Sequence, residues 1–414
     1  MTPQRSHTPT ILLCLLAAFC EGIDLQVAGV AAPGISAEMH PAAALLGYFF
    51  SASTVGLLFG ALLGGHLADR IGRKLVLVWS VGLFGVCSLL TMLARDVDML
   101  LWMRLATGLG LGGAYPNLLA LASEASADNR RNANTTLVYA GTPIGGALVS
   151  LGSSMIAPEH WRWLFAFGGI APLLITPVMA LYLRESPAFL QTQAQAPRHV
   201  AQRGSRLAQF TAILAEGRAP RTLVLWSCFV LTLIIQYLLL SWLPTMMIGD
   251  GLSKPQAGMA QLGFNVGGAI AAIGIGHLLE GRWRRVAVYT AFIALPLLML
   301  AMARAPGEVV VMTALATAIG CAVLSALAFL YATAPLCYPT TIRGTGVGAA
   351  VGAGRIGSII GPLIGGALVG MGHAPGRLLL DLLPIAVAAA IGAIVLAAMN
   401  LRHNEEEATP TGET

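Results

Sequence analysis

Long apolar runs separated by short polar connections occupy almost the whole chain. Each run is about 20 residues long or longer, which is the length of helix that crosses the hydrocarbon core of a bilayer. Within the runs, apolar and polar residues do not alternate at period two, and this favours helices over the strands of a membrane barrel. The pattern predicts twelve membrane-spanning helices, at residues 11–35, 44–68, 75–94, 99–123, 133–156, 163–183, 220–243, 256–279, 286–303, 308–332, 344–371 and 378–400.

The composition excludes an ordinary soluble domain. Hydrophobic residues make up 56% of the 414 positions and charged residues only 10%. The first run, residues 11–35, is too long for the apolar part of a signal peptide and has two acids in its middle, so we expect it to remain as a helix. The predicted fold class is therefore an all-α integral membrane protein.

The basic residues follow the predicted topology. The formal net charge is +5, but most of the Lys and Arg residues fall in alternate connections, so we expect no nucleic-acid partner. By the positive-inside rule, these connections and both termini lie in the cytoplasm. Outside the long middle connection, the basic residues on this side are Arg5, Arg70, Arg73, Lys74, Arg130, Arg131, Arg282, Arg284, Arg285, Arg343 and Arg402.

A long polar segment divides the chain near its midpoint, and the two parts resemble each other. The stretch Gly65–Lys74 recurs in weaker form as Gly276–Arg285, and two shorter matches follow at nearly the same offset. Such matches indicate two parallel repeats. We predict an N-terminal six-helix half at residues 1–183, a cytoplasmic linker at 184–219, a C-terminal six-helix half at 220–402 and a cytoplasmic tail at 403–414.

Two acids, Glu21 and Asp24, lie three residues apart in the middle of the first run. An ionised carboxylate at a bilayer centre costs roughly 2.5 to 3.5 kcal/mol, so acids in such a position indicate a function. The spacing places both on one face of a helix, where repulsion and loss of water make proton uptake easier. We predict that the pair loads and releases protons; the alternative is that one acid pairs with an arginine to hold helices together.

Two arginines also lie inside predicted helices. Arg104 begins a stretch with glycines at 108 and 112, a spacing that permits close helix approach, so its charge needs a partner. Arg355 lies between Gly354 and Gly357, deep in the eleventh run, and its guanidinium could hold a carboxylate bidentately. Arg104 is the alternative candidate for the residue that binds the carboxylate. The structural alternatives are an Arg104 that extends to the helix end and an Arg355 that forms only a salt bridge.

The polar turn between the second and third runs contains Asp69, Arg70, Gly72, Arg73 and Lys74. Charged groups there can bind neighbouring helix ends in one conformation and release them in another. A role in topology alone explains the basic residues but leaves Asp69 and the glycine unexplained. We therefore predict that this turn takes part in gating.

Five segments resemble those of the major facilitator superfamily and, within it, the aromatic acid:proton symporters. Two departures are present: many members have Asp in place of Glu21, and the second-half loop has Glu280 followed by Gly281 where the signature has Asp-Arg. The segments are Gly65–Lys74, Glu21–Gln26, Gly110–Asn117 with Ser123-Glu124, Arg184–Pro187, and Tyr338–Gly346 with Gly354–Gly357.

The resemblance implies proton-coupled import of an aromatic carboxylate, of phenylpropionate or hydroxybenzoate type, across a bacterial inner membrane by alternating access. It implies that Arg104 lies near the acid pair and modulates it, that Asn117 contacts the substrate, and that Glu280 and Arg343 join the gating turn. We expect a monomer in the lipid bilayer with no cofactor and no metal.

The negative charge of such a substrate gives Glu21 and Asp24 a function, which is to carry protons with it. Moving one anion inward against 100 mV costs about 2.3 kcal/mol, and one accompanying proton removes this cost. A proton-driven antiporter that exports amphipathic compounds is the alternative function, because a similar Gly-Pro element to that at 141–146 occurs in drug:proton antiporters. A membrane sensor is a further alternative, but it would need an appended signalling domain. An enzyme is not expected, because no Ser/His/Asp, metal or phosphate-binding motif is present.

Aromatic residues near the expected cavity could stack on a substrate ring. These are Tyr115, Tyr139, Phe229, Tyr237, Trp242 and Phe264. No ring pocket is assigned from the sequence, because aromatic residues near span ends are more often anchors at the membrane interface. We expect this anchoring role for Trp161, Trp163 and Trp242.

Overall fold

The computed structural model describes residues 8–127, 130–186, 189–190, 211–215, 217–280, 284–339 and 342–408, and every regular element among them is a helix. Twelve helices have 19 residues or more. They are α1 (Thr8–Met39), α2 (Ala43–Ile71), α3 (Arg73–Thr91), α4 (Val97–Glu124), α5 (Arg131–Met155), α6 (Trp161–Tyr182), α9 (Ala219–Gly249), α10 (Lys254–Glu280), α11 (Arg284–Arg304), α12 (Val309–Thr333), α13 (Arg343–Gly370) and α15 (Leu383–Ala408).

Each predicted span corresponds to one of these helices, so the predicted all-α class is confirmed. The last span, 378–400, is divided into the short α14 (Leu378–Asp381) and α15. The structure also has three short 3₁₀ turns among the described residues, η1 (Pro158–His160), η2 (Ala334–Cys337) and η3 (Pro375–Arg377). The predicted linker at 184–219 lies mostly outside the described residues, and the predicted domain boundaries remain predictions.

Nine helices in the described part of the chain are individually long and apolar enough to cross a membrane. The other three long helices, α4, α5 and α11, do not reach that measure; α11 contributes only a shorter apolar stretch at Thr290–Arg304. The Gly, Thr and Asn residues of α4 are all buried, so these less apolar positions face protein and not water.

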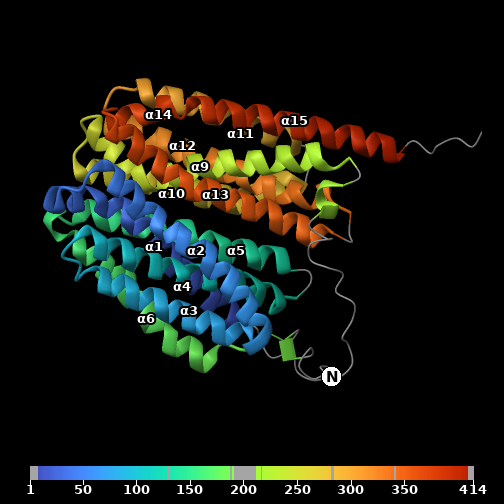
Figure 1. Ribbon diagram of the computed structural model, residues 1–414, viewed down its shortest axis with the longest axis horizontal. Helices are drawn as coiled ribbons and strands as arrows, with labels where there is room; N and C mark the ends of the chain where they lie inside the picture. Colours follow the sequence, from blue (N-terminus) through green and yellow to red (C-terminus); the bar gives the residue numbers. More distant parts are fainter. Residues whose placement is uncertain are drawn as a thin grey trace, which may run out of the picture.

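The helices form two groups that repeat the same pairings. In Figure 1, α1–α6 lie in the lower part and α9–α15 in the upper part. The packing of α1 on α5, α2 on α4 and α3 on α6 is matched by α9 on α13, α10 on α12 and α11 on α15. Across the groups, α2 packs on α13 and α5 on α10, with α1 against α9. The repeated pairing confirms the expected architecture of two pseudo-symmetric six-helix halves.

Glycines allow the paired helices to approach closely. A Cβ at Gly108 of α4 would lie 2.9 Å from the Cα atom of Ser53 on α2. In the other half, a Cβ at Gly320 of α12 would lie 3.0 Å from the Cα atom of Phe264 on α10. Backbone atoms cannot move aside as a flexible side chain can, so a larger residue must separate the helices.

We expect Gly108→Val to destabilise the protein by about 1 to 3 kcal/mol through overpacking. Gly152→Val is the matched control, since a Cβ at Gly152 of α5 would meet nothing within 4 Å. Both substitutions place the same β-branched residue in a helix, so only packing differs between them. The measurement is the Tm of the detergent-solubilised protein, and equal Tm values for the two variants would contradict the packing argument.

Contacts between the two halves gather toward one end of the molecule, here called the contact end. Ser51 Oγ on α2 donates to Ile359 O on α13 at 2.8 Å, and Lys254 Nζ on α10 donates to Ile156 O after α5 at 2.9 Å. Ile156 and Lys254 lie at the turns that join α5 to α6 and α9 to α10, and Ser51 lies in the part of α2 nearer the turn from α1. The opposite end, where α1 begins and α15 ends, is here called the terminal end (Figure 1).

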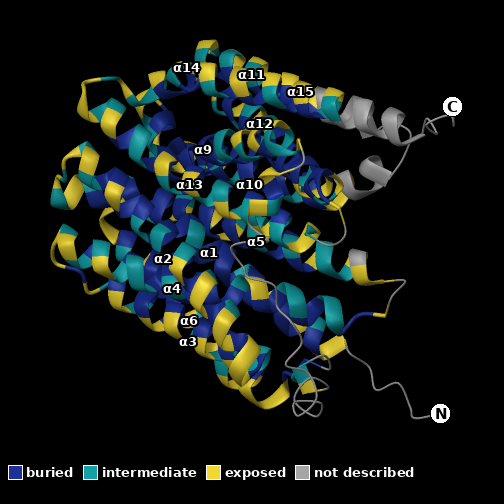
Figure 2. Cartoon of the chain, turned by 45° about the vertical axis from the view of Figure 1, so that its right-hand side comes forward, coloured by how far each residue is buried: buried dark blue, intermediate teal, exposed yellow. Residues whose placement is uncertain are grey.

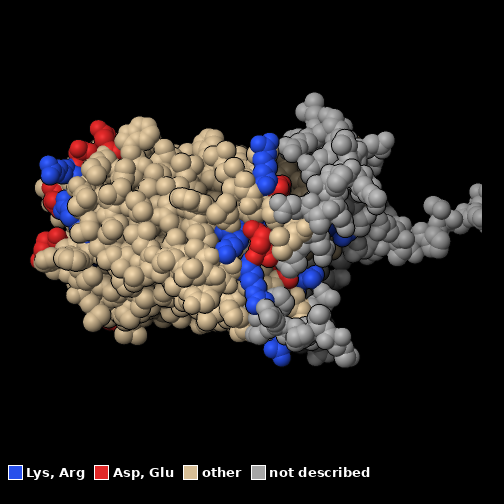
Figure 3. Space-filling view, turned by 90° about the horizontal axis from the view of Figure 1, so that it is seen from below, with Lys and Arg blue, Asp and Glu red and all other residues tan. Residues whose placement is uncertain are grey.

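The outer surface suits a hydrocarbon environment. Large apolar side chains such as Trp79, Trp102 and Leu174 are at least two-thirds exposed, and exposed residues lie on the outward faces of the helices in Figure 2. Figure 3 shows charged side chains at the left edge of the view and in a second band right of centre, with a broad belt of other residues between the two. This is the surface of a multi-pass membrane protein.

The expected interface role of two tryptophans was wrong. Trp161 and Trp242 are buried, with 0% and 1% exposure, whereas Trp163 is 60% exposed. Trp161 Nε1 donates to Glu38 Oε2 at 2.8 Å, and Trp242 Nε1 donates to Pro362 O at 3.1 Å. Both rings therefore join helices within the protein. Their positions near helix ends did not distinguish this role from anchoring in lipid headgroups.

Candidate functional site

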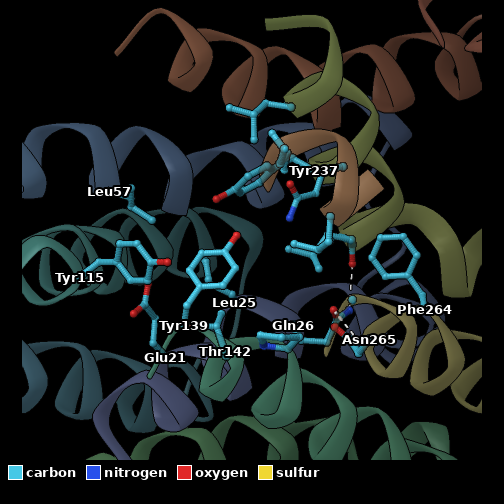
Figure 4. A pocket seen from close by; sticks show the side chains of 18 of the residues that line it. Glu21, Leu25, Gln26, Leu57, Tyr115, Tyr139, Thr142, Tyr237, Phe264 and Asn265 are labelled. Carbon is cyan, nitrogen blue, oxygen red and sulfur yellow. Dashed lines mark hydrogen bonds between the residues drawn. The ribbon is translucent and has the colours of Figure 1, made fainter. Parts of the chain in front are cut away.

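A cavity lies between the two halves and is lined by eight helices. From the first half α1, α2, α4 and α5 contribute, and from the second half α9, α10, α12 and α13. Its walls combine apolar residues, such as Leu25, Leu57 and Phe264, with polar ones (Figure 4). The polar lining consists of Glu21, Gln26, Tyr115, Tyr139, Thr142, Gln236, Tyr237, Asn265, Tyr331 and Arg355.

The cavity contains one acidic and one basic side chain, which come from different halves. Glu21 on α1 is 2% exposed, and its Oε2 atom has no hydrogen-bond partner among the described residues. Arg355 on α13 is partly buried, and its Nη1 donates to the hydroxyl of Tyr237 at 3.2 Å. Figure 4 shows the Glu21 carboxylate pointing toward Tyr115. The site thus offers a buried carboxyl group that can take a proton and a guanidinium that can bind an anion.

The second acid has a different environment. Asp24 Oδ1 accepts from Arg104 Nη1 at 2.5 Å, and both side chains are fully buried. Arg104 Nη2 also donates to the backbone oxygen of Asp24 at 3.2 Å, which fixes α4 against α1. Neither residue lines the cavity. The structure therefore places Arg104 beside the acid pair, as the resemblance implied, but pairs it with Asp24 and leaves Glu21 facing the cavity.

Tyrosines form much of the remaining wall. The rings of Tyr115 and Tyr139 meet edge to face with centroids 6.5 Å apart, and Tyr331 packs on Phe229 at 5.2 Å. Aromatic rings provide both apolar surface and, through their hydroxyl groups, hydrogen bonds. Of the aromatic residues expected near the cavity, Tyr115, Tyr139, Tyr237 and Phe264 line it, whereas Phe229 and Trp242 do not.

Asn117 lies away from the cavity. It is 3% exposed on α4, and its Nδ2 donates to Gly113 O one turn earlier at 2.8 Å. Asn117 is not among the described residues that line the cavity. Its predicted contact with substrate remains a prediction.

A second cluster of charged residues surrounds the turn between α2 and α3 at the terminal end. Gly72 occupies this turn with φ of 98°, a left-handed conformation that favours glycine. The Glu185 carboxylate accepts from the backbone nitrogens of Arg73 at 2.9 Å and Lys74 at 3.1 Å, and so caps α3. The Arg73 side chain forms an ion pair with Glu124 at the end of α4. The turn is thus tied to the end of α4 and to Glu185 at the start of the predicted linker.

Four other predicted gating residues lie in exposed or undescribed positions. Asp69 and Arg70, in the last turn of α2, are exposed, as is Arg343 at the start of α13. The side chain of Glu280 lies outside the described residues. Asp69 and Arg343 carry opposite charges at the terminal end of different halves.

The cap on α3 leads to a stability prediction. Glu185→Gln should cost about 0.5 to 2 kcal/mol, because it weakens charge-assisted hydrogen bonds to two backbone N–H groups at a helix N-terminus. Glu308→Gln is the matched control, since Glu308 occupies the N-cap of α12 without a side-chain hydrogen bond. Thermal unfolding in detergent compares the two. A Tm loss of the same size in both variants would refute a specific role for the Glu185 contacts.

The sequence patterns did not identify several residues of these two sites. Gln236 and Tyr331 line the cavity, yet they stand in apolar runs without any motif. Thr142 also lines it; it lies in the Gly-Pro element at 141–146, but the pattern there predicted no role of its own for this residue. Glu124 and Glu185 fall in segments that carried the family resemblance, but only the fold shows which groups they bind. Intramembrane polar side chains are uncommon, and that rarity is the one signal that could have identified Gln236.

Comparisons with known proteins agree with this architecture. The model of the Major Facilitator Superfamily matches residues 14–362. The 3-(3-hydroxy-phenyl)propionate transporter of Escherichia coli (strain K12) is 38% identical over 377 residues, covering 90% of each chain. The 4-hydroxybenzoate transporter PcaK of Pseudomonas putida is 34% identical over 417 residues, covering 95% of this chain and 93% of the relative.

Solved structures show the same fold at lower sequence identity. A D-xylose-proton symporter superimposes with a TM-score of 0.76 at 18% identity, covering 94% of this chain and 97% of the symporter. A bacterial homologue of the human lysosomal transporter Spinster superimposes with a TM-score of 0.69 at 17% identity, covering 98% of both chains. With the family model matching most of its length, this chain belongs to the Major Facilitator Superfamily.

Proposed function

We propose that this protein imports an aromatic carboxylate together with protons by alternating access. The observation that carries the proposal is the cavity between the halves, where Glu21 and Arg355 lie among four tyrosines. The relatives named for transport of 3-(3-hydroxyphenyl)propionate and 4-hydroxybenzoate support the choice of substrate class. Such a substrate has a carboxylate and an aromatic ring, which match the two kinds of group in the cavity.

Arg355 binds the substrate carboxylate. An arginine fork pairs with a carboxylate through two parallel hydrogen bonds, and partial burial strengthens this interaction. Arg355 is the cation among the described residues that line the cavity, whereas Arg104 already binds Asp24. The Tyr237 hydroxyl, 3.2 Å from Arg355 Nη1, orients the guanidinium toward the cavity. Arg104 is therefore the less suitable of the two predicted anion sites.

Glu21 carries the proton. It faces the cavity and has a buried oxygen without a partner, so burial disfavours its charged form unless a cation approaches. Asp24 and Arg104 remain in the proton-coupling group as the ion pair that fixes α4 beside α1. One proton per carboxylate makes the cycle electroneutral, and this removes the cost of moving an anion against an inside-negative potential.

The two ends of the molecule face different compartments. We place the terminal end in the cytoplasm because the predicted basic connections lie there. The contact end then faces outward, where α2 packs on α13 and α5 on α10. On closure of the terminal end, exposed Asp69 and Arg343 of the two halves attract each other, and the turn at Gly72 acts as a gate.

Uptake into proteoliposomes tests this function. Purified protein is reconstituted, an inward pH gradient is imposed, and labelled 3-(3-hydroxyphenyl)propionate and 4-hydroxybenzoate are supplied separately. We expect accumulation of at least one compound, abolished by a protonophore. Accumulation that persists unchanged after the gradient collapses would reject proton coupling. Failure to transport either compound would reject the substrate class.

A further inference from the structure

Two hydrogen-bonding atoms in the cavity wall have no partner in the protein. Gln236 Oε1 on α9 and Thr142 Oγ1 on α5 are buried, and neither makes a hydrogen bond to another described residue. Both residues line the cavity, one from each half. An unpaired buried polar atom is costly, so these positions indicate a ligand group that can bind there.

The side-chain N–H groups of the other two amides of the cavity, Gln26 and Asn265, already donate to backbone oxygens. Gln26 Nε2 donates to Leu240 O at 2.9 Å, and Gln26 Oε1 accepts from Asn265 Nδ2 at 3.2 Å. Asn265 Nδ2 also donates to Gln261 O at 3.0 Å. These bonds join α1, α9 and α10 and serve the contact between the halves. Gln236 is thus distinguished from Gln26, whose amide oxygen has a partner, by its free acceptor.

The positions of the two residues are fixed by their neighbours. Gln236 precedes Tyr237, whose hydroxyl accepts from Arg355. Thr142 is held close to α1, because a Cβ at Gly22 would lie 2.8 Å from the Cα atom of Thr142. In Figure 4, Thr142 lies between Tyr139 and Gln26. The free oxygens therefore belong to the same cavity and come from different halves, one from α9 and one from α5.

The chemistry of the free atoms selects one end of an aromatic acid. A carboxylate has only acceptor atoms, so it cannot pair with the amide oxygen of Gln236. A phenolic hydroxyl can donate to that oxygen, and it can also exchange a hydrogen bond with the Thr142 hydroxyl. The carboxylate already has a partner in Arg355. The unpaired atoms consequently match a hydroxyl group on the ring.

We propose that Gln236 and Thr142 are specificity-determining residues that hydrogen-bond a hydroxyl group on the substrate ring. This inference rests on the proposed function. It adds that the protein prefers ring-hydroxylated acids over the same acids without the hydroxyl. A site built to bond a hydroxyl rejects the analogue that lacks it, because the polar groups of the site then stay unpaired.

The test compares two substrates in four variants. Counterflow of labelled 3-(3-hydroxyphenyl)propionate and labelled 3-phenylpropionate gives an apparent affinity for each. For the wild type we expect a preference of about 10- to 100-fold for the hydroxylated acid. Gln236→Met and Thr142→Val remove the acceptors at nearly constant volume, and each should reduce the preference to about threefold or less while 3-phenylpropionate is still transported. Gln256→Met and Thr176→Val remove the same groups away from the cavity and should keep the wild-type preference.

The possible outcomes separate this inference from the proposed function. If the wild type transports neither acid, the proposed function fails. If it transports both and the preference is unchanged in Gln236→Met and Thr142→Val, the function stands and the inference is overturned. Loss of transport of both acids in a folded Gln236→Met variant would show a structural role for Gln236. The preference of the Thr142→Val variant for the hydroxylated acid would then decide whether the inference stands. A reduced preference in either variant supports the proposal.

Discussion

Glu21→Gln should abolish accumulation driven by a pH gradient and leave substrate exchange intact. A pH difference of about two units can drive about a hundredfold accumulation of a substrate that moves with one proton, since each factor of ten corresponds to about 1.4 kcal/mol. Gln cannot take up the proton, so the variant should not concentrate the substrate at all. Its carbonyl and amide groups have nearly the size of the protonated carboxyl, so the substrate should still exchange across the membrane.

The comparison uses two assays on the same liposomes. Driven uptake is measured under the imposed gradient, and counterflow is measured with unlabelled substrate inside and no gradient. Glu159→Gln is the control, because Glu159 lies in the exposed η1 turn, with 69% of its side chain accessible. Wild-type accumulation in Glu21→Gln would transfer the coupling role elsewhere, with Asp24 the next candidate.

Arg355→Gln should abolish both driven uptake and counterflow. Hydrogen bonds to charged groups contribute about 1.5 to 3 kcal/mol each, so loss of a bidentate pair should weaken binding about a hundredfold or more. Arg355→Lys keeps the charge but not the fork, so we expect an intermediate loss. Arg304→Gln, at the exposed end of α11, is the matched control and should behave as the wild type.

The pattern of losses distinguishes the two cavity charges. A proton carrier affects only driven transport, whereas a substrate ligand affects every mode of transport. Binding of substrate to the purified variants, measured by calorimetry, separates weak binding from misfolding. Substrate affinity equal to that of the wild type in Arg355→Gln would contradict the assignment and return Arg104 to consideration as the anion site.

The twelve spans could be predicted because their length is set by the bilayer and not by tertiary contacts. Most of the helices are longer than the predicted runs, as α1 at Thr8–Met39 shows against 11–35. The extra turns carry polar residues such as Glu38, which a search for apolar runs omits. Hydropathy also cannot show which aromatic residues face protein, and so the roles expected for Trp161 and Trp242 were wrong.

The intramembrane charges could be found from the sequence, but their partners could not. Glu21 and Asp24 share one helix face by spacing, yet α4 brings Arg104 to Asp24 alone. Arg355 is 334 positions from Glu21 in the sequence (355 − 21), and the two line one cavity only because α1 and α13 meet it from different halves. Partner choice thus depends on how the halves pack together. Neutral lining residues such as Gln236 are even harder to identify from the sequence.

The measurement that tests the central claim most directly is the lumenal pH of proteoliposomes during substrate entry. With a pH-sensitive dye inside and no initial gradient, 3-(3-hydroxyphenyl)propionate is added outside at a pH at which it is ionised. If the protein carries protons with the acid, the lumen should acidify faster than in protein-free liposomes and in Glu21→Gln liposomes. Rapid entry of labelled acid with no acidification beyond that of protein-free liposomes would contradict proton-coupled import.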